Sequence, residues 1–254
     1  MFGIIKTRLK QKFRTMPWPN GPVPELPERF AGCPRIIGPC RQGCRTCIEI
    51  CPTRAVSLTR GHGQAVAIDL GKCIFCRKCE TLCPENVICF TSQHRLSALN
   101  RQHLVVSRDQ NRLPEISVDP RNRMFSRSLK LRQVCAGGCN ACEADTNVLG
   151  TVGWDLARFG IDFVASPRHA DGLLITGPVT GTMEKALIKT YEAVPDPKVV
   201  IAVGACAISG GLYMGHPEQK DGAGTVVPVD LFIPGCPPHP FVILESLLRF
   251  LGRI

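Results

Sequence analysis

The amino-acid sequence predicts an α/β protein in which a parallel β-sheet domain follows a smaller α+β domain rich in cysteine. Two observations lead to this fold class. In the second half, short apolar runs end in glycine-rich or proline-rich loops and alternate with helical stretches, as in strand–helix–strand units. The first half contains ten of the 15 cysteines. A chain of 254 residues has room for two such domains.

The strands expected in the second half cover residues 163–166, 171–177, 198–206 and 225–236, and a helix is expected over residues 182–194. In open parallel sheets, ligands bind beyond the carboxyl ends of the strands. Cys206 and Cys236 both fall at such strand ends.

Charge divides the chain at the same place. Residues 1–134 carry 23 basic and 9 acidic side chains, whereas residues 135–254 carry 8 and 12. A basic half could bind nucleic acid, but no aromatic platform, zinc-finger spacing or recognition motif accompanies the charge. We therefore expect no nucleic-acid partner.

Residues 1–30 are expected to form a basic arm followed by a proline-rich, extended tether. If helical, the arm places Ile4, Ile5, Leu9 and Phe13 near one face among basic side chains, so it could dock on a partner subunit, which we favour, or on an anionic membrane. The arm has no continuous apolar stretch typical of a secretion signal, and no transmembrane segment is visible in the chain. We expect a cytoplasmic location, where clustered cysteines bind metal more often than they form disulfides.

A repeat follows the tether. The segment CRTCIEICPTRAVSL from Cys44 aligns with CRKCETLCPENVICF from Cys76, and the second copy extended back to Cys73 reads C-x2-C-x2-C-x3-C-P. This run is typical of 4Fe-4S binding. Zinc ribbons also use C-x2-C pairs, but they do not need four cysteines in eleven residues ending in proline.

Residues 33–91 resemble a bacterial dicluster ferredoxin, and we assign this domain to residues 31–95. The resemblance implies one 4Fe-4S cluster on Cys73, Cys76, Cys79 and Cys51, and a second on Cys44, Cys47, Cys83 and one further thiol. Cys40 is the expected fourth ligand, although it stands one residue too far from Cys44, and Cys33 is the alternative. Cys89, in an alternating strand-like segment, is expected in the core.

Five ordered motifs mark the second half: CNACE, SPRHAD, LLITGPVT, VGACAISGG and IPGCPPHP. They resemble the electron-transfer small subunit of membrane-bound, group 4 NiFe hydrogenases of the formate hydrogenlyase type, and the related terminal-cluster subunit of respiratory complex I. The resemblance implies a flavodoxin-like domain over residues 134–254 that holds one 4Fe-4S cluster. Its implied ligands are Cys139, Cys142, Cys206 and Cys236, which leaves Cys135 as a spare thiol.

The resemblance implies an electron-relaying subunit of an oxidoreductase with three 4Fe-4S clusters. Every C-x2-C pair belongs to a cluster motif, so the NiFe centre is expected on a partner large subunit. Other iron–sulfur and membrane subunits would hold the chain peripherally on the inner face of the cell membrane. The complex I subunit has adjacent cysteines where Cys139 and Cys142 are separated by two residues, so transfer to quinone or to a nickel-free relative is the second hypothesis. A free ferredoxin-like carrier is the third.

Four further residues have two interpretations each. Glu143 either stabilises the amino end of a helix or acts as a catalytic residue that moves protons or supports the cluster. Arg168 and His169 bond backbone carbonyls or support the site, and His239 donates to a cluster sulfur or lies on the surface.

Residues 96–133 are expected to form an arginine-rich linker that wraps a partner, although the segment HLVVS could pack on the ferredoxin domain.

Overall fold

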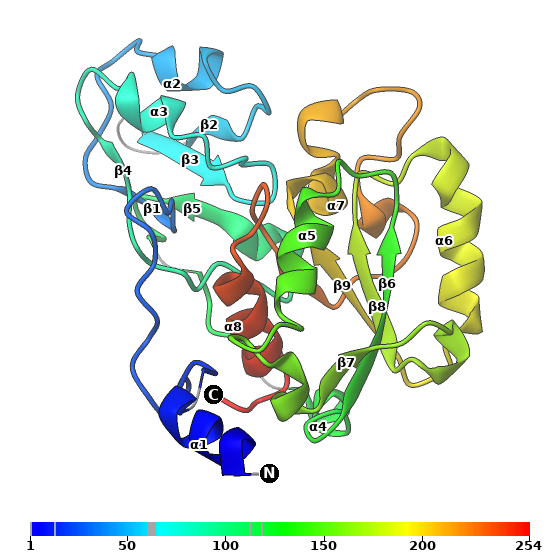
Figure 1. Cartoon of the computed structure of the whole chain (residues 1–254). Coiled ribbons are helices and arrows are strands. Elements are labelled where there is room, and N and C mark those ends of the chain that lie inside the picture. Colours follow the sequence, from blue (N-terminus) through cyan, green and yellow to red (C-terminus); the bar gives the residue numbers. More distant parts are fainter. Residues whose placement is uncertain (1, 13, 60–64, 112, 118) are drawn as a thin grey trace.

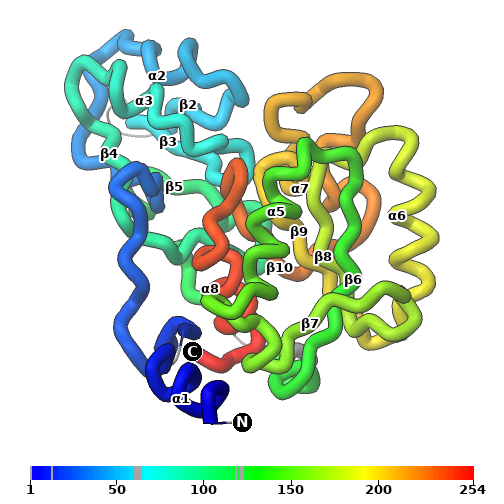
Figure 2. The backbone as a smooth tube through the Cα atoms, viewed as in Figure 1, coloured from blue at the N-terminus to red at the C-terminus, as the bar shows by residue number. Residues whose placement is uncertain are grey.

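The computed structural model describes residues 2–12, 14–59, 65–111, 113–117 and 119–254. A five-stranded parallel sheet lies in the C-terminal part, and two small antiparallel sheets lie in the N-terminal part. Figure 1 shows the two parts side by side, and Figure 2 follows the backbone between them. We call residues 31–107 the N-terminal region and residues 129–254 the C-terminal domain.

The large sheet has the strand order β10-β9-β8-β6-β7, with every neighbouring pair parallel. This order is that of flavodoxin-like folds, so the predicted fold class is confirmed. The strands are β6 (Leu129–Cys135), β7 (Ile161–Phe163), β8 (Gly172–Thr176), β9 (Val199–Val203) and β10 (Leu231–Ile233). Every residue of β8, β9 and β10 is buried, as expected for parallel strands covered on both faces.

Helices cover both faces of this sheet. Figure 1 shows α6 (Gly181–Ala193) on one side, with α5 (Ala141–Val148) and α8 (Pro240–Phe250) on the other. Apart from Arg249, every residue of α8 is buried, because this helix lies between the sheet and the N-terminal part of the chain. The remaining helices of this domain are α7 (Ala205–Ser209), η2 (Leu156–Phe159), η3 (Pro167–His169), η4 (Gly211–Tyr213) and η5 (Ala223–Thr225).

The strand β6 lies within the segment that the sequence predicted to be a linker. Leu129 and Leu131 are fully buried, and β6 pairs with both β7 and β8, so the C-terminal domain begins five residues before the predicted boundary at residue 134. The charged residues in this strand concealed it. Lys130 forms an ion pair with Asp162, which lets a charged residue occupy a strand next to the middle of the sheet. The next strand, β7, begins two residues before the predicted one.

The rest of the predicted linker is also ordered where it is described. It contains η1 (Arg101–Leu104), β5 (Val105–Ser107) and α4 (Pro120–Arg123). Strand β5 pairs with β3 of the N-terminal region, which is the packing that the HLVVS segment allowed. Arg112, one of the arginines of this segment, lies outside the described residues. The part of this segment before residue 108 therefore belongs to the N-terminal region.

The N-terminal region has little regular structure. Its elements are β1 (Pro34–Ile36), paired with β4 (Ile88–Phe90), the sheet of β2 (Val56–Thr59), β3 (Ala65–Asp69) and β5, and the one-turn helices α2 (Thr46–Glu49) and α3 (Lys78–Thr81). In β4 the neighbours Ile88 and Phe90 face the core, whereas Cys89 is exposed. The prediction that Cys89 is a core residue was therefore wrong, because the alternation of the strand turns this side chain outward.

The N-terminal arm forms α1 (Phe2–Gln11), whose residues are all exposed, while Phe13 lies outside the described residues. The tether is anchored to the C-terminal domain. Trp18 is buried edge-on against Phe241 of α8, with ring centroids 5.0 Å apart, and Arg158 donates to its carbonyl oxygen. None of the helices in the described part of the chain is long and apolar enough to cross a membrane.

Candidate iron–sulfur sites

The structure gathers twelve cysteines into three groups of four. The first two lie in the N-terminal region. The first ferredoxin site is a small cavity lined by Cys40, Cys44, Cys47 and Cys83. The second ferredoxin site is another small cavity, lined by Cys51, Cys73, Cys76 and Cys79.

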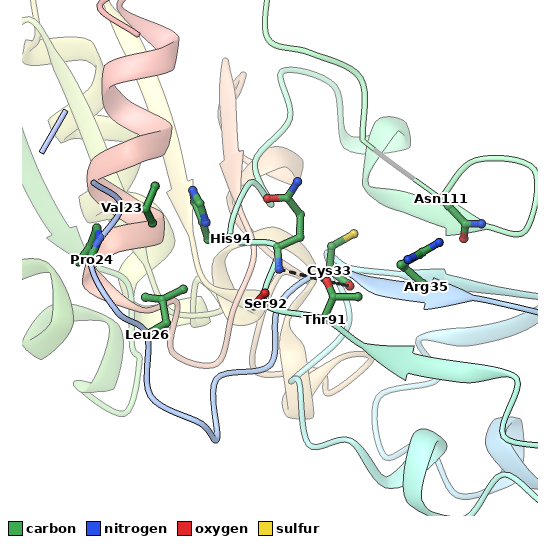
Figure 3. Close-up of a pocket in the computed structure, with 10 residues that line it drawn as sticks. Val23, Pro24, Leu26, Cys33, Arg35, Thr91, Ser92, His94 and Asn111 are labelled. Carbon is green, nitrogen blue, oxygen red and sulfur yellow. Dashed lines mark hydrogen bonds between the residues drawn. The ribbon is translucent and has the colours of Figure 1, made fainter. Parts of the chain in front are cut away.

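The structure distinguishes between Cys40 and Cys33. Cys40 lies on the same cavity as the other three thiols of the first ferredoxin site. Cys33 is buried and lines a different, open cavity of about 680 Å³ together with Arg35 and His94, as Figure 3 shows. Gly43 adopts a left-handed φ of 78° just before Cys44, which accommodates the extra residue in the C-x3-C spacing.

Backbone amides surround the ferredoxin thiols. The N–H groups of Ala55, Phe75 and Val87 donate to the Sγ atoms of Cys51, Cys73 and Cys83, at 3.2, 3.3 and 3.4 Å. Each donor lies two or four residues after its cysteine, so the tight turns of the motif create these bonds. Such hydrogen bonds stabilise thiolate sulfur and tune the reduction potential of a bound cluster.

The third group, which we call the C-terminal site, comes from three loops of the large sheet. Cys139 and Cys142 follow β6 at the start of α5, Cys206 follows β9 in the first turn of α7, and Cys236 follows β10. All three loops lie at the carboxyl edge of the parallel sheet, where such folds bind ligands.

Two glycines leave room for sulfur at this edge. A Cβ atom on Gly204, whose φ is 91°, would lie 2.6 Å from Sγ of Cys142. On Gly211, whose φ is 57°, it would lie 2.8 Å from Sγ of Cys206. Both positions therefore require glycine for backbone conformation and for space.

The pKa values of the thiols agree with the same division into three sites. Burial raises the pKa of Cys73 and Cys79 to about 12 and that of Cys47 and Cys206 to about 11. Burial also raises the pKa of Cys142, and repulsion from Cys206 and other nearby anions adds to the rise. Repulsion acts mainly between cysteines of one site, so these thiols lie close enough to share a cationic group.

The residues fit an iron–sulfur cluster by their donor chemistry. No group of His, Cys, Asp or Glu side chains within the described residues is placed to hold a single metal ion. Three observations support an iron–sulfur cluster instead. Four thiols line each ferredoxin cavity, and backbone N–H groups point at the sulfur atoms. Glycines pack against the thiols of the C-terminal site. Four thiols per site is the donor set of a 4Fe-4S cluster.

Glu143 is buried in the first turn of α5, directly after Cys142. The Thr176 hydroxyl at the end of β8 donates to Oε1 of Glu143. The carboxylate also contributes to the raised pKa of Cys142, after burial and repulsion by Cys206, and to that of Cys206, after burial and repulsion by Cys236 and Cys139. Glu143 therefore lies beside the C-terminal site, and its burial was not evident from the sequence.

His239 is half-buried, and its Nδ1 accepts the N–H of Phe241, so it caps α8. Its ring lies against Trp154, with centroids 6.0 Å apart. Burial lowers the pKa of His239 and raises that of Asp145. The two side chains lie close enough for the charge of each to oppose the shift of the other. The sequence offered no signal for Asp145, because one acidic residue in a helix is common.

The remaining candidates lie away from the thiols. Arg168 and His169 are exposed in η3, which precedes the amino end of β8, whereas the cysteines of the C-terminal site follow the carboxyl ends of other strands. Cys135 is exposed at the last position of β6. It lies outside the three groups, as expected for a spare thiol.

Comparison with known proteins identifies both parts of the chain. Residues 139–250 match the family described as NADH ubiquinone oxidoreductase, 20 Kd subunit. A probable membrane-bound hydrogenase subunit, mbhJ, of Pyrococcus furiosus is 40% identical over 132 residues, which cover 52% of this chain and 79% of that protein. The chain belongs to this 20 Kd subunit family. Residues 39–87 match the 4Fe-4S dicluster domain, so the N-terminal region contains an iron–sulfur domain.

Two other relatives show the breadth of the family. Formate hydrogenlyase subunit 7 of Escherichia coli is 42% identical over 132 residues, which cover 52% of each chain. A subunit of the NADH-quinone oxidoreductase of Clostridium beijerinckii is 41% identical over 118 residues, which cover 46% of this chain and 70% of that protein. The relatives are subunits of oxidoreductase complexes, and the predicted resemblance to hydrogenase and complex I subunits is confirmed.

Proposed function

We propose that the chain is the iron–sulfur electron-transfer subunit of a membrane-associated NiFe hydrogenase complex. It relays electrons through three 4Fe-4S clusters to or from the NiFe centre of a partner large subunit, where protons and dihydrogen interconvert. The observation that carries the proposal is the grouping of twelve cysteines into three sets of four. The relation to hydrogenase and complex I subunits supports it.

Each site takes one cluster in this proposal, with its four cysteines as ligands. A bound 4Fe-4S cluster supplies one-electron chemistry whose potential depends on its surroundings. The residues of this chain set those surroundings. Amides of Ala55, Phe75 and Val87 donate to the ligand sulfurs and favour their anionic form. Gly204 and Gly211 let the backbone approach the C-terminal site closely.

A hydrogenase complex is the favoured assignment over a quinone reductase. Cys139 and Cys142 are separated by two residues, as expected for the hydrogenase subunits that the chain resembles. The alternative is a complex I-like role, in which the chain passes electrons to quinone or to a nickel-free relative. The similarity to an NADH-quinone oxidoreductase subunit supports that alternative.

We assign Glu143 the role of supporting the C-terminal site and handling protons beside it. Its carboxylate is held by Thr176 next to the loop of Cys139 and Cys142, where it can hold a proton when the site gains an electron. This position couples charge at the thiols to charge at the carboxylate.

The helix α1 is proposed to dock on a partner subunit and so help to hold the chain at the inner face of the membrane. Phe2, Ile5 and Leu9 are exposed, and the segment of residues 1–16 carries basic but no acidic side chains. A groove with an apolar floor and an acidic rim matches such a helix. Deletion of residues 2–11 is expected to release the chain from the complex without loss of iron.

Anaerobic purification of the intact complex, with metal analysis and EPR, tests the proposal. Three clusters predict about twelve iron atoms per copy of this chain, and nickel in the large subunit. Replacing both Cys142 and Cys236 by alanine is expected to abolish hydrogen-linked activity and to remove about four iron atoms. Zinc in place of iron, or activity retained in this double variant, would contradict the proposal.

A further inference from the structure

The loops of two proposed cluster sites meet directly at the boundary between the two regions. Ser209 Oγ, at the end of α7, donates to the carbonyl oxygen of Gly71 at 2.8 Å, and both residues are buried. Ser209 lies three residues after Cys206 of the C-terminal site. Gly71 lies two residues before Cys73 of the second ferredoxin site. One hydrogen bond therefore joins the two cysteine-bearing loops.

The turn at Gly71 is held from both sides. Arg101 makes two hydrogen bonds to the carboxylate of Asp69, at 2.7 and 2.8 Å, and Asp69 Oδ1 accepts the N–H of Gly71 at 2.9 Å. A Cβ atom on Gly71 would lie 2.6 Å from Cζ of Arg101 and 2.8 Å from Cγ2 of Ile208 in α7. A side chain at position 71 would displace Arg101 or Ile208, so glycine lets the two loops approach this closely.

A second contact links the same two sites. Ile74 and Phe75, which lie between Cys73 and Cys76, line one cavity together with Gly235 and Cys236 of the C-terminal site. The second ferredoxin site thus faces the C-terminal site through two separate stretches of chain. The cavity that defines the first ferredoxin site is lined by residues 40–47 and 83–87 alone, all within the N-terminal region.

The first ferredoxin site lies next to the second. Helix α2, which carries Cys47, packs against α3, which carries Cys79. The three sites are therefore arranged as a series, with the second ferredoxin site in the middle.

We propose that the contact between Gly71 and Ser209 is the electron-transfer junction of this chain. It fixes the separation between the second ferredoxin site and the C-terminal site, and Gly71 and Ser209 act as its positioning residues. The inference depends on the proposed function, because it assumes that both sites hold clusters. The step moves one electron from a reduced site to an oxidised one, with no bond made or broken. Its rate falls steeply as the two sites separate.

The order of the sites is tested on the full-length protein, reduced with dithionite, by EPR. The signal of the C-terminal site is identified by its absence in Cys236→Ala. Its magnetic coupling to a neighbouring reduced cluster should be lost in Cys76→Ala and retained in Cys44→Ala. Each of these two variants should lack about four iron atoms. Coupling that survives in Cys76→Ala and disappears in Cys44→Ala would overturn the order.

The positioning residues are tested with matched controls. Ser209→Ala removes the hydrogen bond between the loops, whereas Ser246→Ala removes a buried hydroxyl of α8 that bonds only to the carbonyl of Val242 in its own helix. We expect Ser209→Ala to weaken the magnetic coupling and to increase amide hydrogen exchange at residues 70–73 and 205–209. Ser246→Ala should change neither. Equal coupling and equal hydrogen exchange in the two variants would show that Ser209 does not position the two sites.

Gly71→Ala inserts a methyl group into the contact, and its control is Gly224→Ala, where a Cβ meets nothing within 4 Å. The methyl group pushes the two loops apart, and electron transfer slows as the separation of the sites grows. We therefore expect Gly71→Ala to slow electron transfer into the C-terminal site severalfold, with iron content unchanged. An unchanged rate and coupling would contradict the proposal. Failure of the proposed function would appear differently, as missing iron in the unmodified protein.

Discussion

The N-terminal region and the C-terminal domain bring cysteines together by opposite means. In the N-terminal region, eight proposed ligands lie from Cys40 to Cys83, in loops and in helices of four residues, next to strands of only three to five residues. In the C-terminal domain, four proposed ligands are spread from Cys139 to Cys236 and are gathered by a five-stranded sheet in which β8 and β9 are fully buried. We therefore expect the first region to depend on its proposed clusters for its structure, and the second to fold without its proposed cluster.

This difference has a physical cause. The thiols of the N-terminal region occupy much of its small interior, and Cys47, Cys73, Cys79 and Cys83 are all part of the buried core. Short strands and one-turn helices bury too little apolar surface to offset the entropy of ordering the chain. In the C-terminal domain the apolar core is built by β8, β9 and α8, and none of the four cysteines of the C-terminal site is part of it.

The largest effect should follow iron removal. Chelation of iron under reducing conditions is expected to unfold residues 31–107 and to leave residues 129–254 folded, because metal binding supplies folding energy where the apolar core is small. Hydrogen exchange measured by mass spectrometry would show lost protection in β1 to β5 and retained protection in β8 and β9. Restored protection after adding iron and sulfide is the control. Equal loss of protection in both regions would break the comparison.

The substitution Gly204→Ala should affect the C-terminal site and leave the N-terminal region unchanged. It places a Cβ atom 2.6 Å from Sγ of Cys142 at a φ of 91°, which costs about 1–3 kcal/mol in backbone strain alone. We expect loss of about four iron atoms from the C-terminal site, with the EPR signals of the ferredoxin sites unchanged. The exposed position Gly224, changed to alanine, should keep all its iron.

Glu245 tests how well the core of the C-terminal domain tolerates charge. It is buried in α8, and neither carboxylate oxygen accepts a hydrogen bond within the described part of the chain, although Arg95 and Arg249 lie 3.3 and 3.7 Å away. Burial raises its pKa to about 7 despite these two arginines. The folded state therefore holds the proton more tightly than the unfolded state, and this stability is lost as the pH rises from about 4.5 through 7.

Glu245→Gln should accordingly raise the stability at pH 8 by about 1–3 kcal/mol and have little effect near pH 4.5. Thermal unfolding of the full-length protein at several pH values measures the difference. A gain that does not depend on pH would show that packing, and not ionisation, is responsible.

The smallest expected effect concerns Thr176. Thr176→Val removes the hydroxyl that donates to the buried Glu143, at a cost of about 1 kcal/mol. The measured quantities are the unfolding midpoint and the reduction potential of the C-terminal site. Thr176→Ser keeps the hydroxyl and should behave like the unmodified protein. A change of potential in the valine variant alone would connect Glu143 to the site, whereas identical potentials would limit Thr176 to a structural role.

Several features of this protein could be predicted from short stretches of sequence. The ligand spacing from Cys73 to Cys83, the alternation of apolar strands with glycine-rich loops, and the motifs around Cys142, Cys206 and Cys236 each depend on a few neighbouring residues. Strand β6 was not predicted, although residues 129–132 alternate between apolar and charged side chains, because the many arginines of this segment indicated a linker. Only its pairing with β7 and β8 shows why the charges are tolerated.

The sequence by itself determined the donor chemistry, the two-part organisation and the α/β class, because these follow from residue type and spacing along the chain. Only the tertiary structure decided that Cys40 and not Cys33 lies with the first ferredoxin site, that Cys89 faces solvent, and that Gly71 meets Ser209. These outcomes depend on which surfaces pack together. Residues far apart in sequence become neighbours through burial of apolar surface and exclusion of water, which no local pattern records.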